Sequence, residues 1–257
     1  MTETVSERAR ELFAPLGPTY DRYARLLSFG QDPRWRRFMV SRLPVGPEDT
    51  VVDIACGTGA VVLELVRQTG CSVVGVDQSP EMLAEARRRL ADDERVRLVG
   101  ASAAELPFAD ASFDGLTAAY LLRYLDDLPA GLAELARVLR PGASAALLDF
   151  WVPPAPVARQ AWNFWVDAGL PLAGRAISPG WHEVGRFLGD SIRRFHAEWP
   201  LARLLGAFRE AGFESPSARR LSLGGCLVLW GRRHERRLDG AHQRAEAAAL
   251  PAPGAGK

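Results

Sequence analysis

From Thr50 onward, short apolar runs alternate with segments whose apolar residues recur every three or four positions. The runs TVVDIA, SVVGVD, RVRLVGA, FDGLTAAY, SAALLDF and GCLVLWG each predict a β-strand. The segments GAVVLELVRQT, SPEMLAEARRRL, LPAGLAELARVL and LARLLGAFREAGF each predict an amphipathic helix, the second capped by Ser79, and Arg140-Pro141-Gly142 is expected to turn the chain after the third. Strands that alternate with helices build a parallel sheet covered on both faces, so we predict a doubly wound α/β fold.

Three regions depart from this alternation. Residues 1–45 predict a helical cap, because YDRYARLLSFG and PRWRRFMVSRL carry apolar and aromatic residues at helical spacing. Residues 151–200 are rich in Pro, Trp and Phe and predict an insertion over one end of the sheet. Residues 46–150 and 201–233 then form the core, and 234–257 have too little apolar material to pack, so we expect the end of this tail to be disordered.

Composition removes several classes of function. The 257 residues carry 32 basic and 31 acidic side chains, a formal net charge of +1, which is not the positive field of a nucleic-acid-binding protein. Cys56, Cys71 and Cys226 have neither the pairing of a disulfide framework nor the spacing of a metal site. The sequence has no run of about 18 apolar residues, and its charged start MTETVSERARELF lacks the apolar core of a secretion signal, so we expect a cytoplasmic protein.

The stretch VVDIACGTG, residues 51–59, ends an apolar strand and places two glycines in the turn that follows. Glycine lets a ligand approach the backbone closely, which indicates a small-molecule site. A phosphate-binding P-loop is excluded because it needs a lysine in the turn. A dinucleotide fingerprint needs a third glycine where Val62 stands, and the Asp53 carboxylate would repel the phosphates. The same carboxylate favours a cationic ligand.

S-adenosylmethionine suits this turn because it carries a sulfonium and an ammonium and no phosphate. A second carboxylate, Asp77, ends the next apolar run twenty residues after Gly57, where it would accept hydrogen bonds from ribose hydroxyls. An ordinary strand-to-helix turn without a ligand is the alternative for the glycines, but it does not explain why Asp53 and Asp77 both end strands here. We predict S-adenosylmethionine as the cofactor, and no metal ion.

Motifs outside the turn occur together in one known family. Tyr20-Asp21, Ser28-Phe29-Gly30, Trp35-Arg36-Arg37, LPFADASFD, RVLRPG, LPLAG, FLGDSIRRF and LGGCLVLWG follow one another as they do in that family. On these motifs the chain, from about Phe13 to Arg233, resembles the class I S-adenosylmethionine-dependent methyltransferases that act on demethylmenaquinone and on the polyprenyl benzoquinols of ubiquinone synthesis. The resemblance implies a seven-stranded, mostly parallel, Rossmann-like sheet and C-methylation of a quinol.

The resemblance also implies which residues hold the cofactor. It places Thr58 in the glycine turn, Asp77 on the ribose, Ser102-Ala103 beside the adenine and Ala119 near the methionine end. Ser102 stands where the family has Asp or Asn, and its hydroxyl is a weaker acceptor for the adenine amine. The expected cofactor site comprises Tyr20, Asp53, Ala55, Gly57, Thr58, Gly59, Asp77, Gln78, Met82, Ser102, Ala103 and Ala119.

The family's Gly-Leu-Arg-Asn element corresponds to Leu121-Leu122-Arg123-Tyr124, which keeps the arginine and replaces the Gly and Asn. Methyl transfer is an in-line displacement, and a quinol ring carbon attacks only after a neighbouring hydroxyl loses its proton. An arginine is a poor base, so Arg123 is expected to orient a water or stabilise the phenolate, with Tyr124 as its hydrogen-bonding partner. The alternative for Arg123 is a surface arginine on a loop.

The insertion is expected to cover the methyl acceptor. Trp162 and Trp165, together with Phe29, either line an apolar acceptor channel or belong to the core. His182 and His196 are candidate general bases or acceptor contacts, whereas His234 and His242 lie in the charged tail and are expected to be solvated.

The identity of the acceptor has alternatives. Tyr23-Ala24, Asp32-Pro33 and Trp230 depart from the family, and these departures concern the acceptor. The enzyme alternative is a C-, O- or N-methyltransferase of specialised metabolism on the same scaffold, and the other is a cofactor-binding module without activity. A prenylated quinol lies in the bilayer, so the quinol prediction implies peripheral contact with the inner face of the membrane through the insertion and Arg159, Arg175 and Arg186. A homodimer is compatible with the sequence.

Overall fold

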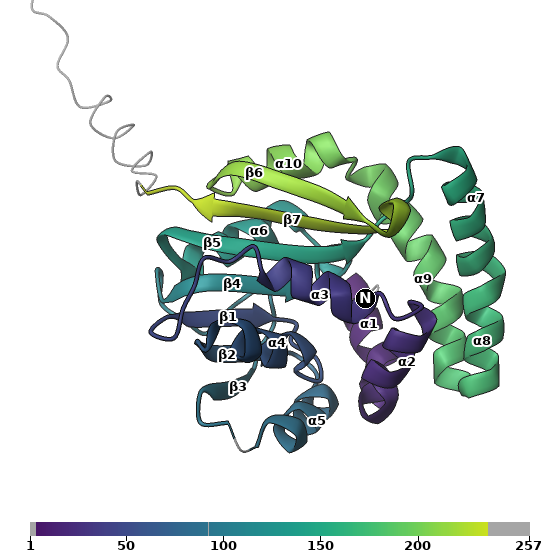
Figure 1. Ribbon diagram of the computed structural model, residues 1–257, viewed down its shortest axis with the longest axis horizontal. Coiled ribbons are helices and arrows are strands. Elements are labelled where there is room, and N and C mark those ends of the chain that lie inside the picture. Colours follow the sequence, from purple (N-terminus) through teal and green to yellow (C-terminus); the bar gives the residue numbers. More distant parts are fainter. Residues whose placement is uncertain (1–3, 92, 236–257) are drawn as a thin grey trace, which may run out of the picture.

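The computed structural model describes residues 4–91 and 93–235 (Figure 1). Within them, seven strands form one sheet in the order β3-β2-β1-β4-β5-β7-β6. The strands are β1 (Thr50–Ile54), β2 (Ser72–Asp77), β3 (Val96–Gly100), β4 (Phe113–Ala119), β5 (Leu139–Phe150), β6 (Phe213–Leu221) and β7 (Cys226–Arg233). Strands β1 to β5 pair in parallel, and β7 is antiparallel to β5 and β6. The predicted doubly wound, mostly parallel, seven-stranded sheet is confirmed.

Helices cover both faces of the sheet because neighbouring strand residues point to opposite sides. One face carries α6 (Leu128–Val138) and α10 (Leu201–Glu210), and the other carries α3 (Asp32–Val40), α4 (Ala60–Thr69) and α5 (Pro80–Leu90). Val52 and Leu147 belong to the apolar cluster on the first face, and Val51 and Leu148 to the cluster on the second. Ser79 caps α5 as predicted, since its Oγ accepts a hydrogen bond from the Met82 backbone N–H at 3.2 Å.

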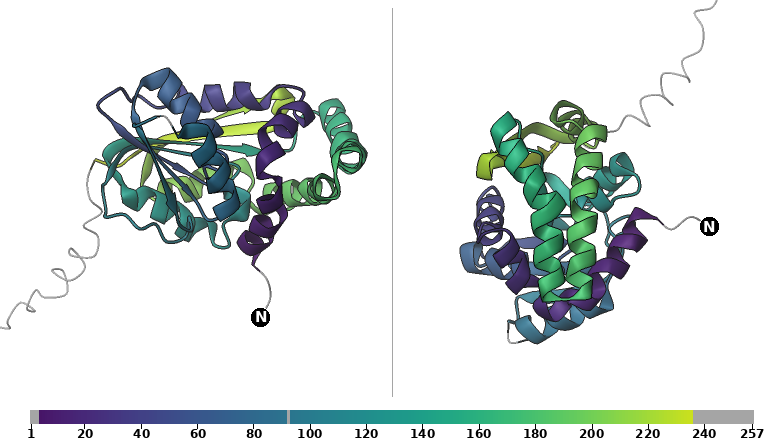
Figure 2. Two further views of the ribbon diagram at one scale, coloured as in Figure 1. Left: turned by 90° about the horizontal axis from the view of Figure 1, so that it is seen from below. Right: turned by 90° about the vertical axis from the view of Figure 1, so that its right-hand side faces the viewer.

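A helical cap lies beyond the carboxyl ends of the parallel strands (Figures 1 and 2). It joins two segments far apart in the sequence: α1 (Val5–Phe13), a 3₁₀ turn (Ala14–Thr19) and α2 (Tyr20–Leu27), and then α7 (Pro156–Phe164), a π turn (Trp165–Gly169), α8 (Leu170–Ile177) and α9 (Pro179–Glu198). Leu16 of the first segment packs with Trp181 and Val184 of the second in a separate apolar cluster. The two segments together enclose the space at this edge of the sheet.

Two local expectations need correction. The sequence does not predict β6, because this edge strand alternates exposed Ser and Arg residues and contains Pro216. The tripeptide Arg140-Pro141-Gly142 is expected to form a turn between a helix and a strand, but β5 already begins at Leu139. The tripeptide instead forms a bulge within β5, with Gly142 at φ +81°. The predicted disorder at the end of the chain and His242 lie outside the described residues, while His234 places Nδ1 at 3.2 Å from Glu214 Oε1.

Within residues 4–91 and 93–235, no helix is both long and apolar enough to cross a membrane. In the same part of the chain, His, Cys, Asp and Glu side chains form no group of three or more that could hold a metal ion.

Candidate active site

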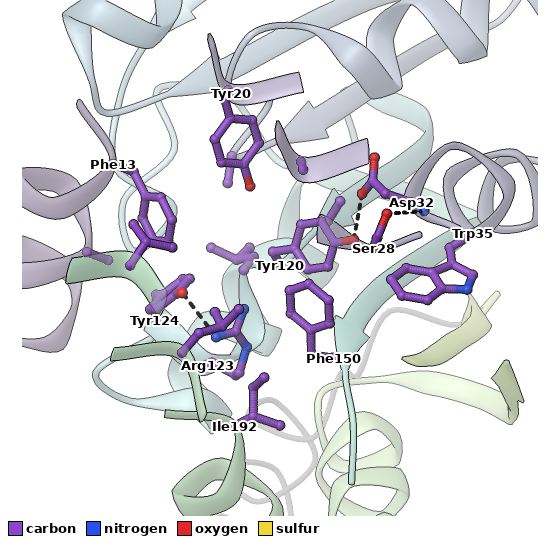
Figure 3. Close-up of a pocket in the computed structure, with 18 of the residues that line it drawn as sticks. Phe13, Tyr20, Ser28, Asp32, Trp35, Tyr120, Arg123, Tyr124, Phe150 and Ile192 are labelled. Carbon is purple, nitrogen blue, oxygen red and sulfur yellow. Dashed lines mark hydrogen bonds between the residues drawn. The ribbon is translucent and has the colours of Figure 1, made fainter. Parts of the chain in front are cut away.

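A cavity of about 660 Å³ lies between the carboxyl ends of the strands and the helical cap. One end is bounded by the turn after β1, and the other reaches Phe150 at the end of β5 and Ile192 of α9 (Figure 3). Its volume is that of a typical small-molecule site. Its lining includes small and acidic residues such as Ala55, Gly57 and Asp77, and aromatic residues such as Trp35, Tyr124 and Phe150.

The glycine turn shapes the first end. Gly57 has φ +55° and lines the cavity, and a Cβ placed on it would meet no atom within 4 Å, so the turn leaves open space against its backbone. Gly59 has φ +82°, and a Cβ there would come within 2.6 Å of Leu90 Cδ1. Gly59 is predicted as a cofactor contact, but it does not line the cavity. Its lack of a side chain instead lets α5 pack against the turn.

Asp77 holds the turn in place from the end of β2. Its Oδ2 accepts a hydrogen bond from the Gly57 N–H at 2.8 Å, and its Oδ1 accepts one from the Ser79 N–H at 2.9 Å. The side chain lines the cavity although the residue is only 9% exposed. Burial raises the pKa of Asp77 above its ordinary value, and the backbone hydrogen bonds oppose this rise.

Asp53, at the end of β1, lies behind the cavity wall. Its Oδ1 accepts a hydrogen bond from the Thr117 hydroxyl at 2.7 Å, whereas its Oδ2 is buried and has no partner in the described chain. Burial raises the pKa of Asp53 to about 7. The carboxyl group expected to meet a cation directly is thus set one layer back from the cavity, where its ionised form adds negative charge beneath the turn.

The remaining predicted cofactor residues all lie on the cavity wall: Tyr20, Ala55, Thr58, Gln78, Met82, Ser102, Ala103 and Ala119. The Thr58 hydroxyl donates to Asp21 Oδ2 at 2.8 Å, which joins the glycine turn to α2 of the cap. The Ser102 hydroxyl accepts a hydrogen bond from the Ala104 N–H at 3.2 Å. The structure therefore brings residues from four strand ends and the cap to one surface.

Arg123 lies on the wall at the other end, in a 3₁₀ turn (Leu122–Tyr124). Its side chain is 1% exposed, its Nε donates to Asp149 Oδ1, and its Nη1 donates to the Tyr124 hydroxyl at 3.0 Å (Figure 3). The alternative of a surface arginine is therefore wrong. Burial opposes the charged form, but Asp149 and Tyr124 together outweigh it and raise the pKa of Arg123, so this side chain is a permanent cation and not a proton acceptor.

Of the five predicted acceptor contacts, three line the cavity: Phe29, Trp162 and Trp165. The rings of Phe29 and Trp165 lie 4.6 Å apart at the cavity edge. The two histidines do not line it. His182 Nδ1 lies 2.9 Å from the Pro171 carbonyl oxygen, and His196 packs against Trp151 at 4.8 Å, because the face of α9 that meets the cavity carries other residues.

Sequence reasoning missed a second polar group on the cavity wall, formed by Asp32, Arg36 and Tyr120. Arg36 Nε donates to Asp32 Oδ2 at 2.9 Å, and the Tyr120 hydroxyl donates to Asp32 Oδ1 at 2.6 Å. All three residues are buried. The spacing of Asp32 and Arg36, four residues apart on a predicted helix, is the one signal in the sequence that could have indicated the ion pair.

A Rossmann-like sheet of this topology, with a glycine turn after β1 and an acidic residue ending β2, defines a class I S-adenosylmethionine-dependent methyltransferase. The model of the ubiE/COQ5 methyltransferase family matches residues 1–233. The chain belongs to this family and is a methyltransferase enzyme, as predicted.

Individual relatives agree with this assignment. A protein of Geobacter sp. (strain M21) named ubiquinone/menaquinone biosynthesis C-methyltransferase UbiE is 39% identical over 194 residues, which cover 74% of this chain and 82% of that protein. The demethylmenaquinone methyltransferase of Clavibacter sepedonicus is 36% identical over 214 residues, 83% of this chain and 85% of that protein. A solved S-adenosylmethionine-dependent methyltransferase of Thermotoga maritima superposes with a TM-score of 0.59 over 88% of this chain and 99% of its own, at 20% identity, and so shares the fold.

Proposed function

We propose that this methyltransferase transfers the methyl group of S-adenosylmethionine to a ring carbon of a quinol-type acceptor. The observation that carries the proposal is the continuity of the cavity: it runs from the glycine turn to Arg123 between aromatic walls, so a donor at the turn and an aromatic acceptor would share one space. The names of the relatives from Geobacter and Clavibacter support the choice of acceptor.

The residues at the first end fit the donor. Asp77 presents a carboxylate where a ribose would lie, and Gly57 leaves room for a ligand against the backbone. Asp53 beneath the turn has an unpaired Oδ2, and the ionised form of this carboxyl group adds negative charge there, which favours a ligand that carries cations. When bound, S-adenosylmethionine supplies a methyl group activated by its sulfonium.

The residues at the second end have three tasks in this proposal. The aromatic wall orients the acceptor ring and excludes water. The Arg123 cation stabilises the negative charge that develops when a ring hydroxyl ionises, and Tyr124 adds a hydrogen bond to the same oxygen. Neither residue takes the hydroxyl proton, because Arg123 stays charged and burial raises the pKa of Tyr124, so this proton and the hydrogen that the methylated carbon then loses both pass to solvent.

Mass spectrometry of products from a panel of quinols tests the proposal. We expect one methyl group added to a ring carbon that bears hydrogen, and none added to a matched quinol already methylated at that carbon. Products methylated on oxygen would overturn the assignment of a C-methyltransferase. They would favour the second candidate, a methyltransferase of specialised metabolism, which the replacement of the family's Gly and Asn by Leu121 and Tyr124 on the cavity wall supports.

A further inference from the structure

The cavity wall includes a cation whose hydrogen-bonding capacity is largely unused. Arg36 lies on α3, its side chain is 9% exposed, and it lines the cavity. Its Nε donates to both carboxylate oxygens of Asp32, at 3.0 and 2.9 Å. Its two terminal nitrogens donate to no residue in the described part of the chain. A buried guanidinium with free donors on a cavity wall can bind an anion.

Neighbouring side chains fix the orientation of this guanidinium. Asp32 holds Nε, and Tyr120 donates its hydroxyl to Asp32 Oδ1 at 2.6 Å (Figure 3). The Tyr120 ring lies under the guanidinium carbon at 5.2 Å and stacks on Phe150 at 4.6 Å. The ion pair and the ring leave the two terminal nitrogens of Arg36 as the accessible edge.

Arg36 stands between the two ends of the cavity, since Tyr120, which lies under its guanidinium, stacks on Phe150 of the acceptor end. Tyr120 directly follows Ala119, which ends β4 on the cavity wall. Burial raises the pKa of Asp53 beneath the glycine turn, and the charge of Arg36 lowers it in part, so the guanidinium acts across to the turn. The unused donors therefore lie near the place where the methionine part of the donor would sit.

Two further arginines line the cavity within the described residues: one is bound at the acceptor end and the other is exposed. Arg123 is bound to Asp149 and Tyr124 at the acceptor end. Arg10 is an exposed residue of α1, and its charge acts on Glu81 at the start of α5. Among the described arginines on the cavity wall, Arg36 is therefore the buried one whose terminal nitrogens are available to a donor ligand.

We propose that Arg36 binds the α-carboxylate of the methyl donor and that Asp32 and Tyr120 are its positioning residues. The carboxylate is the donor's one anionic group, and it enters a region already lined by Asp21 and Asp77. A cation offsets that repulsion, and the guanidinium fork can form two parallel N–H···O bonds to a carboxylate. This assignment rests on the proposed donor site.

Calorimetry with two ligands that differ only in this group tests the proposal. The ligands are S-adenosylhomocysteine and its decarboxylated counterpart, S-adenosyl-3-thiopropylamine. For Arg36→Gln we expect S-adenosylhomocysteine to bind at least tenfold more weakly and the decarboxylated ligand to bind as in the wild type. Arg34→Gln, an exposed residue of the same helix that does not line the cavity, is the matched control and should change neither affinity. Equal weakening of both ligands, or unchanged binding of S-adenosylhomocysteine, would overturn the assignment.

A second pair of variants guards against unfolding, because Arg36→Gln leaves the Asp32 carboxylate buried without its cation. The double variant Asp32→Asn/Arg36→Gln removes both charges, and Arg36→Lys keeps the charge without the fork. Both should lose affinity for S-adenosylhomocysteine selectively, Arg36→Lys by less. If either folded variant binds both ligands normally, the proposal is wrong.

An ionised acceptor is the other ligand that could place an anionic oxygen at Arg36. A third ligand distinguishes binding of the acceptor from binding of the donor. An ionised 2-hydroxy-1,4-naphthoquinone serves as the probe. If Arg36→Gln loses this probe alone and keeps both adenosyl ligands, Arg36 serves the acceptor and the donor assignment falls. These titrations do not depend on turnover, so a wild-type enzyme that methylates no quinol would refute the proposed acceptor and leave the Arg36 result intact.

Discussion

The Gly57 backbone N–H donates to Asp77 Oδ2 at 2.8 Å, so the two motifs that identify the donor site are directly bonded to each other. The other carboxylate oxygen accepts the Ser79 N–H at the start of α5. Asp77 therefore fixes the glycine turn, and in the proposed donor site its remaining lone pairs would accept hydrogen bonds from the ligand.

Asp77→Ala should weaken S-adenosylmethionine binding by about 1.5–3 kcal/mol, because charge-assisted hydrogen bonds to the ligand are lost. Calorimetry measures this difference. Asp77→Asn, which keeps one acceptor oxygen, should lose less. An unchanged affinity in Asp77→Ala would remove Asp77 from the donor site, and tight NADH binding by the wild type would contradict the assignment of the glycine turn to S-adenosylmethionine.

The two turn glycines should respond differently to alanine. At Gly57 the new Cβ meets nothing within 4 Å and points into ligand space, so we expect weaker donor binding and a strain of about 1 kcal/mol from φ +55°. At Gly59 the Cβ would clash with Leu90, so we expect a larger loss of stability, about 2–3 kcal/mol. Urea unfolding and calorimetry on both variants measure the two effects. Equal behaviour of the two variants would contradict the assignment of one glycine to binding and the other to packing.

The location of the candidate donor site was predictable because its parts are local to strand ends. The turn after β1 and Asp77 follow from residue order alone, and in the structure Gly57, Thr58 and Asp77 all line the cavity. The Asp32–Tyr120 hydrogen bond joins residues 88 positions apart, and no periodicity reports such a contact. The position of His182 also could not be predicted, because tertiary packing decides which side of α9 faces the cavity. His182 lies on another side and contacts Pro171.

The raised pKa of Asp53 predicts that the free energy of unfolding depends on pH. Burial raises its pKa to about 7 in the folded chain, whereas an unfolded Asp titrates near 4. Between these values the folded chain holds a proton that the unfolded chain has released, so this group's contribution to the unfolding free energy falls as pH rises from about 4 to about 7. Asp53→Asn cannot titrate, and the wild type should lose on the order of 2–4 kcal/mol relative to it across this window. Urea unfolding at a series of pH values checks this, and a constant difference would refute the raised pKa.

Replacing Arg123 should reduce turnover without changing the affinity for the donor. Arg123→Ala should lower kcat by about a hundredfold and leave S-adenosylmethionine affinity nearly unchanged, because the cation acts on the acceptor. The same change leaves Asp149 buried and unpaired, at a cost of about 3–5 kcal/mol in stability, so the double variant Arg123→Gln/Asp149→Asn is measured beside it. Tyr124→Phe keeps the stacking on Phe187 and removes only the hydroxyl. Normal turnover in a folded double variant would leave Arg123 with a structural role.

If the quinol carries a prenyl chain, we expect the protein to contact the membrane near the acceptor end of the cavity. Phe29, Phe164 and Leu172 are exposed by 66–73% on the cap, and Phe29 and Trp165 line the cavity, so an apolar rim leads from the surface to the acceptor end. Arg175 and Arg186 are exposed on α8 and α9, whereas Arg159 is engaged with the Pro153 and Pro154 carbonyls. We expect reversible, salt-sensitive binding to anionic vesicles, with about 1 kcal/mol from each free arginine near the surface.

Vesicle sedimentation at low and high salt measures this binding. Trp162→Ser/Trp165→Ser should weaken it through the apolar rim, and Arg175→Gln/Arg186→Gln should weaken it through charge. Arg140→Gln is the matched control, because this exposed arginine lies at the start of β5, at the edge of the sheet opposite the cap. A water-soluble acceptor requires no such contact. If the protein ignores anionic vesicles at low salt and turns over a tail-less quinol as fast as a prenylated one, the prenylated acceptor is refuted while the methyltransferase assignment, which rests on the donor site and the family, stands.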